Sequence, residues 1–205
     1  MAVALLGFAL ACLTALVMTV LAASAHAQVP PGAARYRAEL TRAAHSQWGL
    51  DAPVAALAAQ VHQESGWMPQ AVSRVGAAGL GQFMPATARW WCQREGTAPA
   101  QCLPHNPTWA LRALVGYDKY LFDRAPARYT ARDRFWVALR AYNGGLGHWR
   151  AEAESTGVSD PSRPQVDAAC GRAKRHPAHC SENLDYPARI MGILQPRYAT
   201  WGPSL

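Results

Sequence analysis

One glutamate, Glu64, ends a predicted helix and is followed by a segment that glycines interrupt repeatedly. Apolar residues recur at helical spacing from Val54 to Val61, and continuing this stripe by three residues reaches Glu64. Asp51 and Pro53 suit the start of such a helix, and Gly66 suits the residue just beyond its end. The glycines between positions 76 and 81 suit a bent segment that approaches a ligand closely. The chain is therefore expected to fold as short helices around a bent connection.

The position of Glu64 predicts an unusual carboxyl group. On the apolar side of the helix it is partly removed from water, and the helix C-terminus also disfavours its anion, so both effects raise its pKa. A carboxylic acid that stays protonated near neutral pH can give its proton to a leaving oxygen. No other acidic residue stands between Asp51 and Glu95, so acid-base chemistry in this region depends on one carboxyl group. For a glutamate taken alone, a solvated side chain at a frayed helix end is the simpler interpretation.

Three ordered motifs favour the chemical interpretation. The first holds Glu64-Ser65, Ser73, Gly76-Ala77-Ala78-Gly79-Leu80, Gln82, Met84-Pro85 and Thr87-Ala88. The second is Ala141-Tyr142-Asn143-Gly144-Gly145, and the third is Glu182-Asn183-Leu184-Asp185-Tyr186 with Ile190. Together they resemble the catalytic core of soluble lytic transglycosylases, the peptidoglycan-cleaving branch of the lysozyme-like superfamily. The resemblance covers roughly residues 50 to 195.

Three positions depart from the pattern of that family. Gly81 stands where many members have methionine, which removes a side chain that would cover one wall of the cleft. Gly144 replaces an alanine and leaves the polar groups of its motif in place. Pro187 replaces a valine and is compatible only with the first turn of a helix. The last helix is therefore predicted to begin near Asp185 or Tyr186.

The resemblance implies a mainly α, lysozyme-like single domain with at most a small β-ribbon, near residues 71 to 83. It also implies cleavage of the MurNAc-β-1,4-GlcNAc bond in peptidoglycan glycan strands. Glu64 would protonate the glycosidic oxygen and then, as a carboxylate, take the proton from the muramoyl 6-hydroxyl, which closes onto C1. The product is a 1,6-anhydroMurNAc end, and no cofactor takes part. Asp118, Asp123 and Asp133 lie on predicted packing helices, so none is an obvious second carboxylate.

Site residues carried over from the family are catalytic Glu64 and the substrate-binding residues Ser65, Ser73, Gln82, Tyr142, Asn143 and Tyr186. The two tyrosines are expected beside the Glu64 carboxyl, whereas Asn143 and Gln82 would hold N-acetyl or hydroxyl groups of the sugar. Two alternatives are a hydrolytic muramidase of the same fold, such as a lysozyme or endolysin, and a catalytically silent wall-binding or secretion-apparatus protein. Wall recycling, assembly of a secretion apparatus and phage lysis are all compatible contexts.

Residues 1–27 have the composition of a signal peptide, because they contain no charged residue and end in Ala25-His26-Ala27. Cleavage there would leave residues 28–205 as an exported, periplasmic catalytic domain with no stable membrane span. An uncleaved membrane anchor is the alternative, since the apolar stretch is long enough to cross a bilayer.

Cysteine spacing agrees with an oxidising compartment. Cys12 lies in the export segment, and the other four cysteines form two closely spaced couples, Cys92 with Cys102 and Cys170 with Cys180. These pairings are favoured because each closes a short loop. A zinc site is the alternative, since two histidines stand between the members of the second couple, but the spacing matches no standard ligand pattern. No metal is predicted.

The charge of the chain indicates an anionic partner. Lys plus Arg exceed Asp plus Glu by 20 − 13 = +7. Cell-wall polymers with free stem-peptide carboxylates are anionic and would be attracted to such a surface. Nucleic acid is not predicted as a partner, because no basic run is interleaved with aromatic residues.

Local signals mark the remaining elements. A helix carrying Tyr36 and Leu40 is predicted to end near Gly49. Other helices are predicted from Pro85 through Trp91, from Asn106-Pro107 to Leu121, and from Thr130 to Asn143. Residues 150–180 are rich in Ser, Pro, Arg and Ala, and are interpreted as an inserted loop held by its own disulfide. Trp67, Trp90 and Trp91 are interpreted mainly as core residues, with stacking on sugars as the alternative.

Overall fold

A computed structural model describes residues 29–203 and 205, so the predicted signal peptide at 1–27 lies outside the described residues. All the regular elements that it describes are helical. They are η1 (Pro31–Tyr36), α2 (Arg37–Trp48), α3 (Val54–Ser65), α4 (Pro85–Arg94), η2 (Pro99–Gln101), α5 (Pro107–Phe122), α6 (Ala131–Gly144), α7 (Leu146–Ser155), α8 (Arg163–Ala168), η3 (Pro177–His179), α9 (Cys180–Arg189), η4 (Ile190–Leu194) and η5 (Gln195–Trp201). The mainly α prediction is confirmed.

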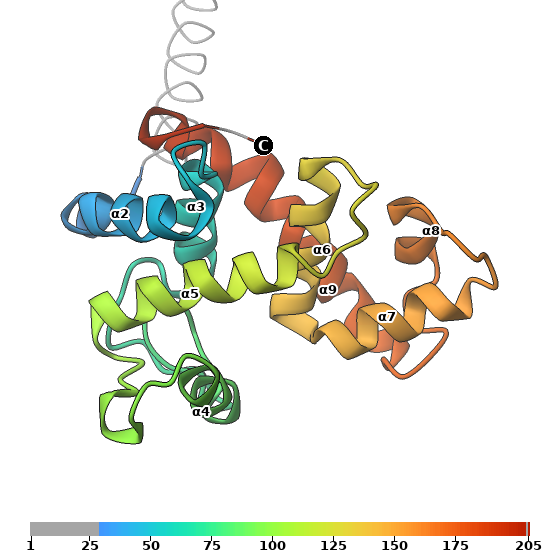
Figure 1. Cartoon of the computed structure of the whole chain (residues 1–205), viewed down its shortest axis with the longest axis horizontal. Coiled ribbons are helices and arrows are strands. Elements are labelled where there is room, and N and C mark those ends of the chain that lie inside the picture. The colour runs from blue at the N-terminus through green and yellow to red at the C-terminus, as the bar shows by residue number, and fades with distance from the viewer. Residues whose placement is uncertain (1–28, 204) are drawn as a thin grey trace, which may run out of the picture.

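Helix α5 crosses the middle of the molecule (Figure 1). Helices α2 and α3 lie on one side of it with the C-terminal segment, and α4 lies on the other, while α6 to α9 gather at its far end. Buried Leu57 of α3, Leu111 and Leu114 of α5, and Phe135 and Leu139 of α6 belong to the central core. Because α3 is packed on several sides, every residue from Val54 to Val61 is buried. Its C-terminal end, and therefore Glu64, is held in place by the core.

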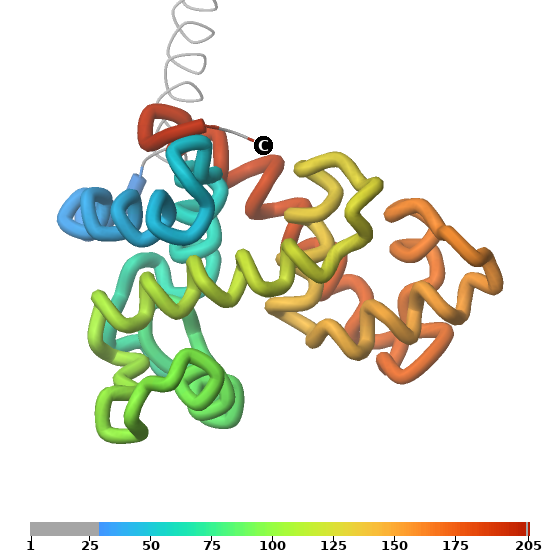
Figure 2. Tube along the Cα trace, viewed as in Figure 1, coloured from blue at the N-terminus to red at the C-terminus, as the bar shows by residue number. Residues whose placement is uncertain are grey.

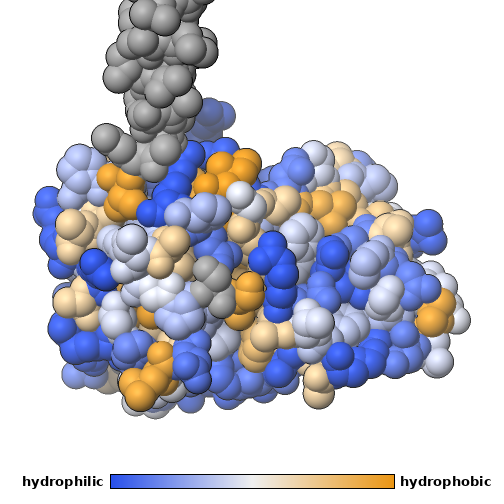
Figure 3. Space-filling view, turned by 90° about the horizontal axis from the view of Figure 1, so that it is seen from above, coloured by the Kyte–Doolittle hydropathy of each residue, from blue (hydrophilic) through white to orange (hydrophobic). Residues whose placement is uncertain are grey.

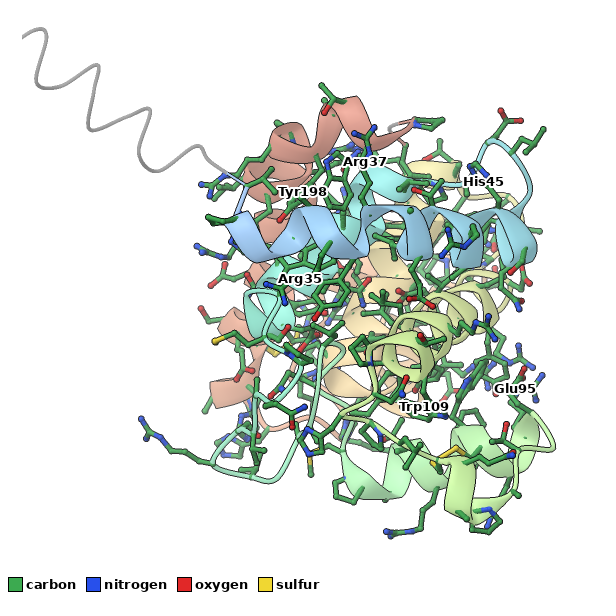
Figure 4. All side chains as sticks on the ribbon, turned by 90° about the vertical axis from the view of Figure 1, so that its left-hand side faces the viewer. Arg35, Arg37, His45, Glu95, Trp109 and Tyr198 are labelled. Atoms are coloured by element: carbon green, nitrogen blue, oxygen red, sulfur yellow. A yellow bond between two sulfur atoms is a disulfide. The ribbon has the colours of Figure 1, made fainter. Side chains whose placement is uncertain are left out.

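The C-terminal segment closes the core behind α2. Tyr198 of η5, labelled in the side-chain view (Figure 4), is fully buried. The Trp67 indole N–H donates to the Tyr198 hydroxyl at 2.7 Å, and that hydroxyl also lies 2.9 Å from His62 Nδ1. These contacts tie the residues on either side of Glu64 to the last helical turns of the chain.

The bent connection between α3 and α4 takes the place of the predicted β-ribbon (Figure 2). It holds two isolated antiparallel bridges, Val72 with Ala78 and Ala78 with Phe83, and the described residues form no longer strand. Gly79 has φ +75°, and a Cβ there would lie 1.8 Å from the Pro104 carbonyl oxygen. The loop can therefore pack against the chain at Pro104 only with glycine at this position.

Two predicted helix starts are wrong. Helix α3 begins at Val54 with Pro53 as its N-cap, so Asp51 does not cap it. Helix α9 begins at Cys180, well before Asp185, and contains Pro187 in its interior. Pro187 cannot donate to the Asn183 carbonyl, but the side chains of both residues are buried, and tertiary packing outweighs the missing bond. The wider π-helical turn η4 follows directly.

Residues 150–180 contain more helix than the predicted loop. The segment holds the end of α7, all of α8 and the short η3 (Figure 1). Val166 and Trp149 pack with Val137 in a small second apolar cluster. A buried network of ion pairs around Arg140 holds this segment in place. Its members are far apart in the sequence, so they form no periodic pattern that would predict helices here.

Two disulfides join Cys92 to Cys102 and Cys170 to Cys180, the couples that the sequence favours. The sulfurs that the alternative zinc site would require are therefore bonded to each other. Seen from above, apolar residues form small separate groups among hydrophilic ones (Figure 3). Within the part of the chain that the structure describes, every helix is too short or too polar to span a bilayer.

Candidate active site

Glu64 lies in the last turn of α3, one residue before Ser65, and is half-buried. Gly66 ends the helix in the left-handed conformation, with φ 58°, as the sequence predicted. The Tyr186 hydroxyl of α9 donates a hydrogen bond to Glu64 Oε1. Burial raises the pKa of Glu64 from 4.5 to about 8, and the bond from Tyr186 lowers it in part. Glu64 is therefore a carboxylic acid at neutral pH, which is the state that a proton donor needs.

A second tyrosine fixes the wall beside Glu64. The Tyr142 hydroxyl, at the end of α6, donates to the Gly81 carbonyl oxygen at 2.6 Å. Burial, and then the nearby Glu64 carboxylate, raise the pKa of Tyr142 and of Tyr186 well above that of a free phenol. A side chain at position 81 would lie 2.8 Å from the Phe83 ring and 3.1 Å from the Tyr142 hydroxyl. The Phe83 ring thus occupies the space that Gly81 leaves open.

Three of the predicted substrate-binding residues hold the bent connection together. Ser65 is buried, and its hydroxyl donates to the Leu80 carbonyl oxygen at 3.0 Å. Ser73 Oγ accepts from the Ala77 N–H at 2.9 Å and closes a turn. The Gln82 amide nitrogen donates to the carbonyl oxygens of Gly79, at 2.9 Å, and Ala71, at 3.2 Å. Ser65 and Ser73 therefore help to position the loop, while the Ser73 O–H and Gln82 Oε1 make no hydrogen bond among the described residues.

The groove at Glu64 has a volume of about 380 Å³. Its lining residues are Gln63, Glu64, Asn143, Glu182, Asp185, Tyr186 and Arg189. Asn143 is exposed, and its Oδ1 accepts from the Asn183 amide at 2.9 Å, while its own amide nitrogen makes no hydrogen bond to the described residues. Of the predicted residues, the groove thus brings together Glu64, Asn143 and Tyr186.

Sequence reasoning missed Gln63 and Arg189 of this groove. The Arg189 guanidinium Nε donates to Gln63 Oε1 at 2.7 Å, which places a cation on the rim beside Glu64. Gln63 directly precedes Glu64, and Arg189 lies between Tyr186 and Ile190 of the third motif, so closeness to the motif residues was the available signal. Glu182 and Asp185 of α9 are exposed where they line the groove, and Asp185 accepts from the Ser181 hydroxyl at 3.0 Å.

One further carboxyl group lies behind Glu64. Asp118 of α5 is 0% exposed, and Gln60, one turn before Glu64 on α3, donates to Asp118 Oδ1 at 3.3 Å. Burial raises the pKa of Asp118 well above its usual value. Asp118 does not line the groove, so its carboxyl group does not face a sugar or a water bound there. Asp118 is therefore a packing residue, as its helix suggested, and not a partner of Glu64 in the groove.

The disulfide at the start of α9 supports the groove. Cys180 is the first residue of this helix, which carries Asn183 and Tyr186. We expect the double change Cys170→Ser with Cys180→Ser to lower stability by about 3 kcal/mol and to reduce activity further than stability alone explains, because Tyr186 moves relative to Glu64. Thermal melting and initial rates at a temperature where both proteins are folded would measure this.

The matched control removes the other disulfide, with Cys92→Ser and Cys102→Ser. That bond joins the end of α4 to its following loop and touches no groove residue. A similar loss of stability with nearly normal activity is expected. Equal loss of activity in the two double variants would contradict a specific role for the Cys170 disulfide.

Solved structures share this architecture. The 70 kDa soluble lytic transglycosylase from Escherichia coli has a TM-score of 0.58 at 24% identity, over 81% of this chain and 24% of that chain. An inactive mutant of lytic transglycosylase Slt from Pseudomonas aeruginosa has a TM-score of 0.59 at 20% identity, over 82% and 25%. At such identities the likeness shows the fold alone. Fold and groove together define a lysozyme-like, all-α domain with one shielded glutamate at the end of a central helix.

Sequence comparison narrows this class to one family. The model of the transglycosylase SLT domain matches residues 39–162, more than half of the chain. This protein belongs to the transglycosylase SLT domain family. The membrane-bound lytic murein transglycosylase F of Alteromonas mediterranea is 39% identical over 92 residues, and that of Maricaulis maris 40% over 95 residues. Each match covers 45% of this chain but only 18% of the relative, so the chain spans less than a fifth of the curated relatives' length.

Proposed function

We propose that this chain is a peptidoglycan lytic transglycosylase, which cleaves the MurNAc-β-1,4-GlcNAc bond and leaves 1,6-anhydroMurNAc ends. The observation that carries the proposal is the shielded Glu64 carboxyl, which has a raised pKa and is hydrogen-bonded to Tyr186 in an open groove. The matching relatives are named murein transglycosylases, which supports the same substrate. A net charge of +7 favours attraction to anionic wall polymers.

The groove can supply both proton transfers with one carboxyl group. Glu64 begins protonated and gives its proton to the glycosidic oxygen. The resulting carboxylate accepts the Tyr186 hydrogen bond and takes the proton of the muramoyl 6-hydroxyl, whose oxygen closes onto C1. Glu64 ends the reaction protonated, as it began. Water is not consumed, because the muramoyl 6-hydroxyl is the nucleophile. The free Asn143 amide nitrogen and Gln82 Oε1 are proposed to orient the sugar.

Hydrolysis is the second candidate, because Glu182 and Asp185 also line the groove. Either could serve as the base that activates water in a hydrolytic muramidase. Both are exposed on the rim, and Asp185 is occupied by the Ser181 hydroxyl, which favours the intramolecular route.

The test is mass spectrometry of muropeptides released from purified peptidoglycan. The proposal expects 1,6-anhydro ends from the wild type, and expects Asp185→Asn to leave the type of product unchanged. Reducing ends from the wild type would instead identify a hydrolase. Release of no muropeptide by the wild type would favour a silent wall-binding protein.

Activity should depend on pH through Glu64. Its pKa is raised from 4.5 to about 8, so the carboxyl keeps its proton through neutral pH and loses it as the pH rises through about 8. We expect kcat/KM to fall on the alkaline side with a midpoint near 8, since the free enzyme must start protonated. Tyr186→Phe removes the bond that lowers this pKa, so its midpoint should move upward. A wild-type midpoint near 4.5 would show instead that Glu64 is solvated.

The periplasm is the proposed place of action, with residues 28–205 as the catalytic domain. The two disulfides support an oxidising compartment, and peptidoglycan lies in the same place. Sequencing the N-terminus of the exported protein would test cleavage after Ala27; an N-terminus at Met1 would contradict it.

A further inference from the structure

Trp90 of α4 stands apart from the other aromatic residues. Its side chain is 40% exposed, while Trp67 and Trp91 are buried, as the sequence predicted for them. Every other tryptophan, tyrosine and phenylalanine among residues 29–203 is buried or half-buried. A single exposed apolar residue needs no explanation by itself, so the surroundings of Trp90 decide its meaning.

A continuous row of aromatic rings connects Trp90 to the candidate active site. Tyr142, whose hydroxyl holds Gly81, lies 5.4 Å from Tyr117 between ring centroids. Tyr117 in turn lies 5.9 Å from Trp90, and Tyr120 lies 5.4 Å from Trp90. These spacings are those of rings in direct contact. The wall that begins at the phenol near Glu64 therefore ends at the exposed indole.

A cavity of about 360 Å³ lies at this wall and shares no lining residue with the groove that holds Glu64. Trp90, Tyr117 and Tyr120 line it, together with Thr87 and Leu146. The cavity thus offers aromatic faces and few polar groups, bounded by α4, α5 and the start of α7. Such a lining suits the apolar C–H face of a sugar ring, with the Thr87 hydroxyl available to one of its polar edges.

We propose that this cavity is a subsite for a further sugar of the glycan strand, with Trp90 as its stacking platform. This inference rests on the proposed transglycosylase function and extends its substrate from the two sugars at the cleaved bond to a longer strand. Trp90 determines the preference of the enzyme for long strands. The proton transfers at Glu64 do not depend on it.

Positive charge beside Tyr120, one of the residues that line the cavity, agrees with this occupant. The guanidinium carbons of Arg94 and Arg124 lie 4.4 and 3.4 Å from the centroid of the Tyr120 ring. Neither arginine has an acidic partner within ion-pair distance among the described residues. Their positive charge suits a glycan that carries stem-peptide carboxylates.

The experiment measures binding of strands of two lengths to full-length protein carrying Glu64→Gln, in which the strands stay intact. Trp90→Ala added to this background should weaken binding of long strands about tenfold, the effect of losing one stacked aromatic contact. Binding of a disaccharide confined to the Glu64 groove should not change. Trp90→Phe should restore most of the affinity, because it keeps a ring. In the enzyme with Glu64, Trp90→Ala should raise KM for long strands and leave kcat nearly unchanged.

Leu103→Ala is the matched control, since Leu103 is exposed and apolar but does not line the cavity. Thermal melting establishes that each variant is folded. Unchanged binding of long strands by the Trp90→Ala protein, or equal weakening for both lengths, would overturn the subsite. Binding that depends on Trp90 in a protein that makes no 1,6-anhydro ends would support the subsite and refute the proposed function alone.

Discussion

Glu64→Gln is expected to lower the release of 1,6-anhydro muropeptides about a thousandfold, within the range that general acid-base catalysis contributes. Glutamine keeps the size of the side chain and can still accept the Tyr186 hydrogen bond, but its amide N–H is too weakly acidic to protonate the glycosidic oxygen. Substrate binding should change little, so the loss should appear in kcat rather than in KM. Quantitative muropeptide mass spectrometry with both proteins measures it.

Glu154→Gln provides the matched control. Glu154 is exposed near the end of α7 and lies outside the groove, so the same change of charge there should leave activity normal. Residual activity within tenfold of wild type in the Glu64→Gln protein would mean that another group supplies the proton. Glu182 would then be the first residue to examine, because it lines the same groove.

Arg140→Met is expected to reduce the free energy of unfolding by about 3–5 kcal/mol, a large part of the stability of an ordinary domain. Arg140 and Glu152 are both 0% exposed, and Arg140 Nη2 donates to Glu152 Oε2 at 2.6 Å. The same guanidinium binds Asp167 at 2.9 Å and Asn183 at 2.9 Å. Methionine fills part of the volume but removes the donor to Glu152 Oε2, Asp167 Oδ1 and Asn183 Oδ1, while Arg175 still binds Glu152 and Arg163 still binds Asp167. Urea denaturation followed by circular dichroism gives the value.

Arg128→Met is the control for the same substitution at the surface. Arg128 is exposed and paired with Asp160 at 2.5 Å, and surface pairs contribute about 0–1 kcal/mol. A comparable loss of unfolding free energy in both variants would show that burial is not the reason for the stabilising effect of the Arg140 network. Because Asn183 also holds Asn143 in the groove, Arg140→Met should reduce activity as well as stability.

Helix boundaries with a local chemical signal could be predicted. Asn106 caps α5 by accepting from the Trp109 N–H at 3.1 Å, and Thr130 caps α6 by accepting from the Asp133 N–H at 3.1 Å. The cap and the group that it satisfies are three residues apart, so the sequence contains both. The end of α3 at Gly66 could be predicted for the same reason, because the glycine itself is the local signal. That end also places Glu64 in the last turn of its helix.

Parts of the groove could be predicted only in outline. The family motifs indicated Tyr142 and Tyr186 as neighbours of Glu64, and the structure bonds Tyr186 to it directly. The motifs did not distinguish side chains that meet the groove from side chains that hold the loop. The hydroxyls of Ser65 and Ser73 bond to the loop main chain, so both side chains take part in holding the loop. Hydrogen-bond partners of this kind depend on how the loop bends.

The sequence by itself determined the helical class, the place of Glu64 at a helix end, the two cysteine couples and the caps of α5 and α6, because each depends on residues that are close along the chain. Tertiary structure alone decided that α9 continues through Pro187, that residues 150–180 fold around Arg140, and that Trp90 stays exposed beside an aromatic row. Those outcomes depend on burial and on partners far apart in sequence. The free energy of tertiary packing outweighs the intrinsic helix or loop preference of these residues, and it cannot be predicted from neighbouring residues in the sequence.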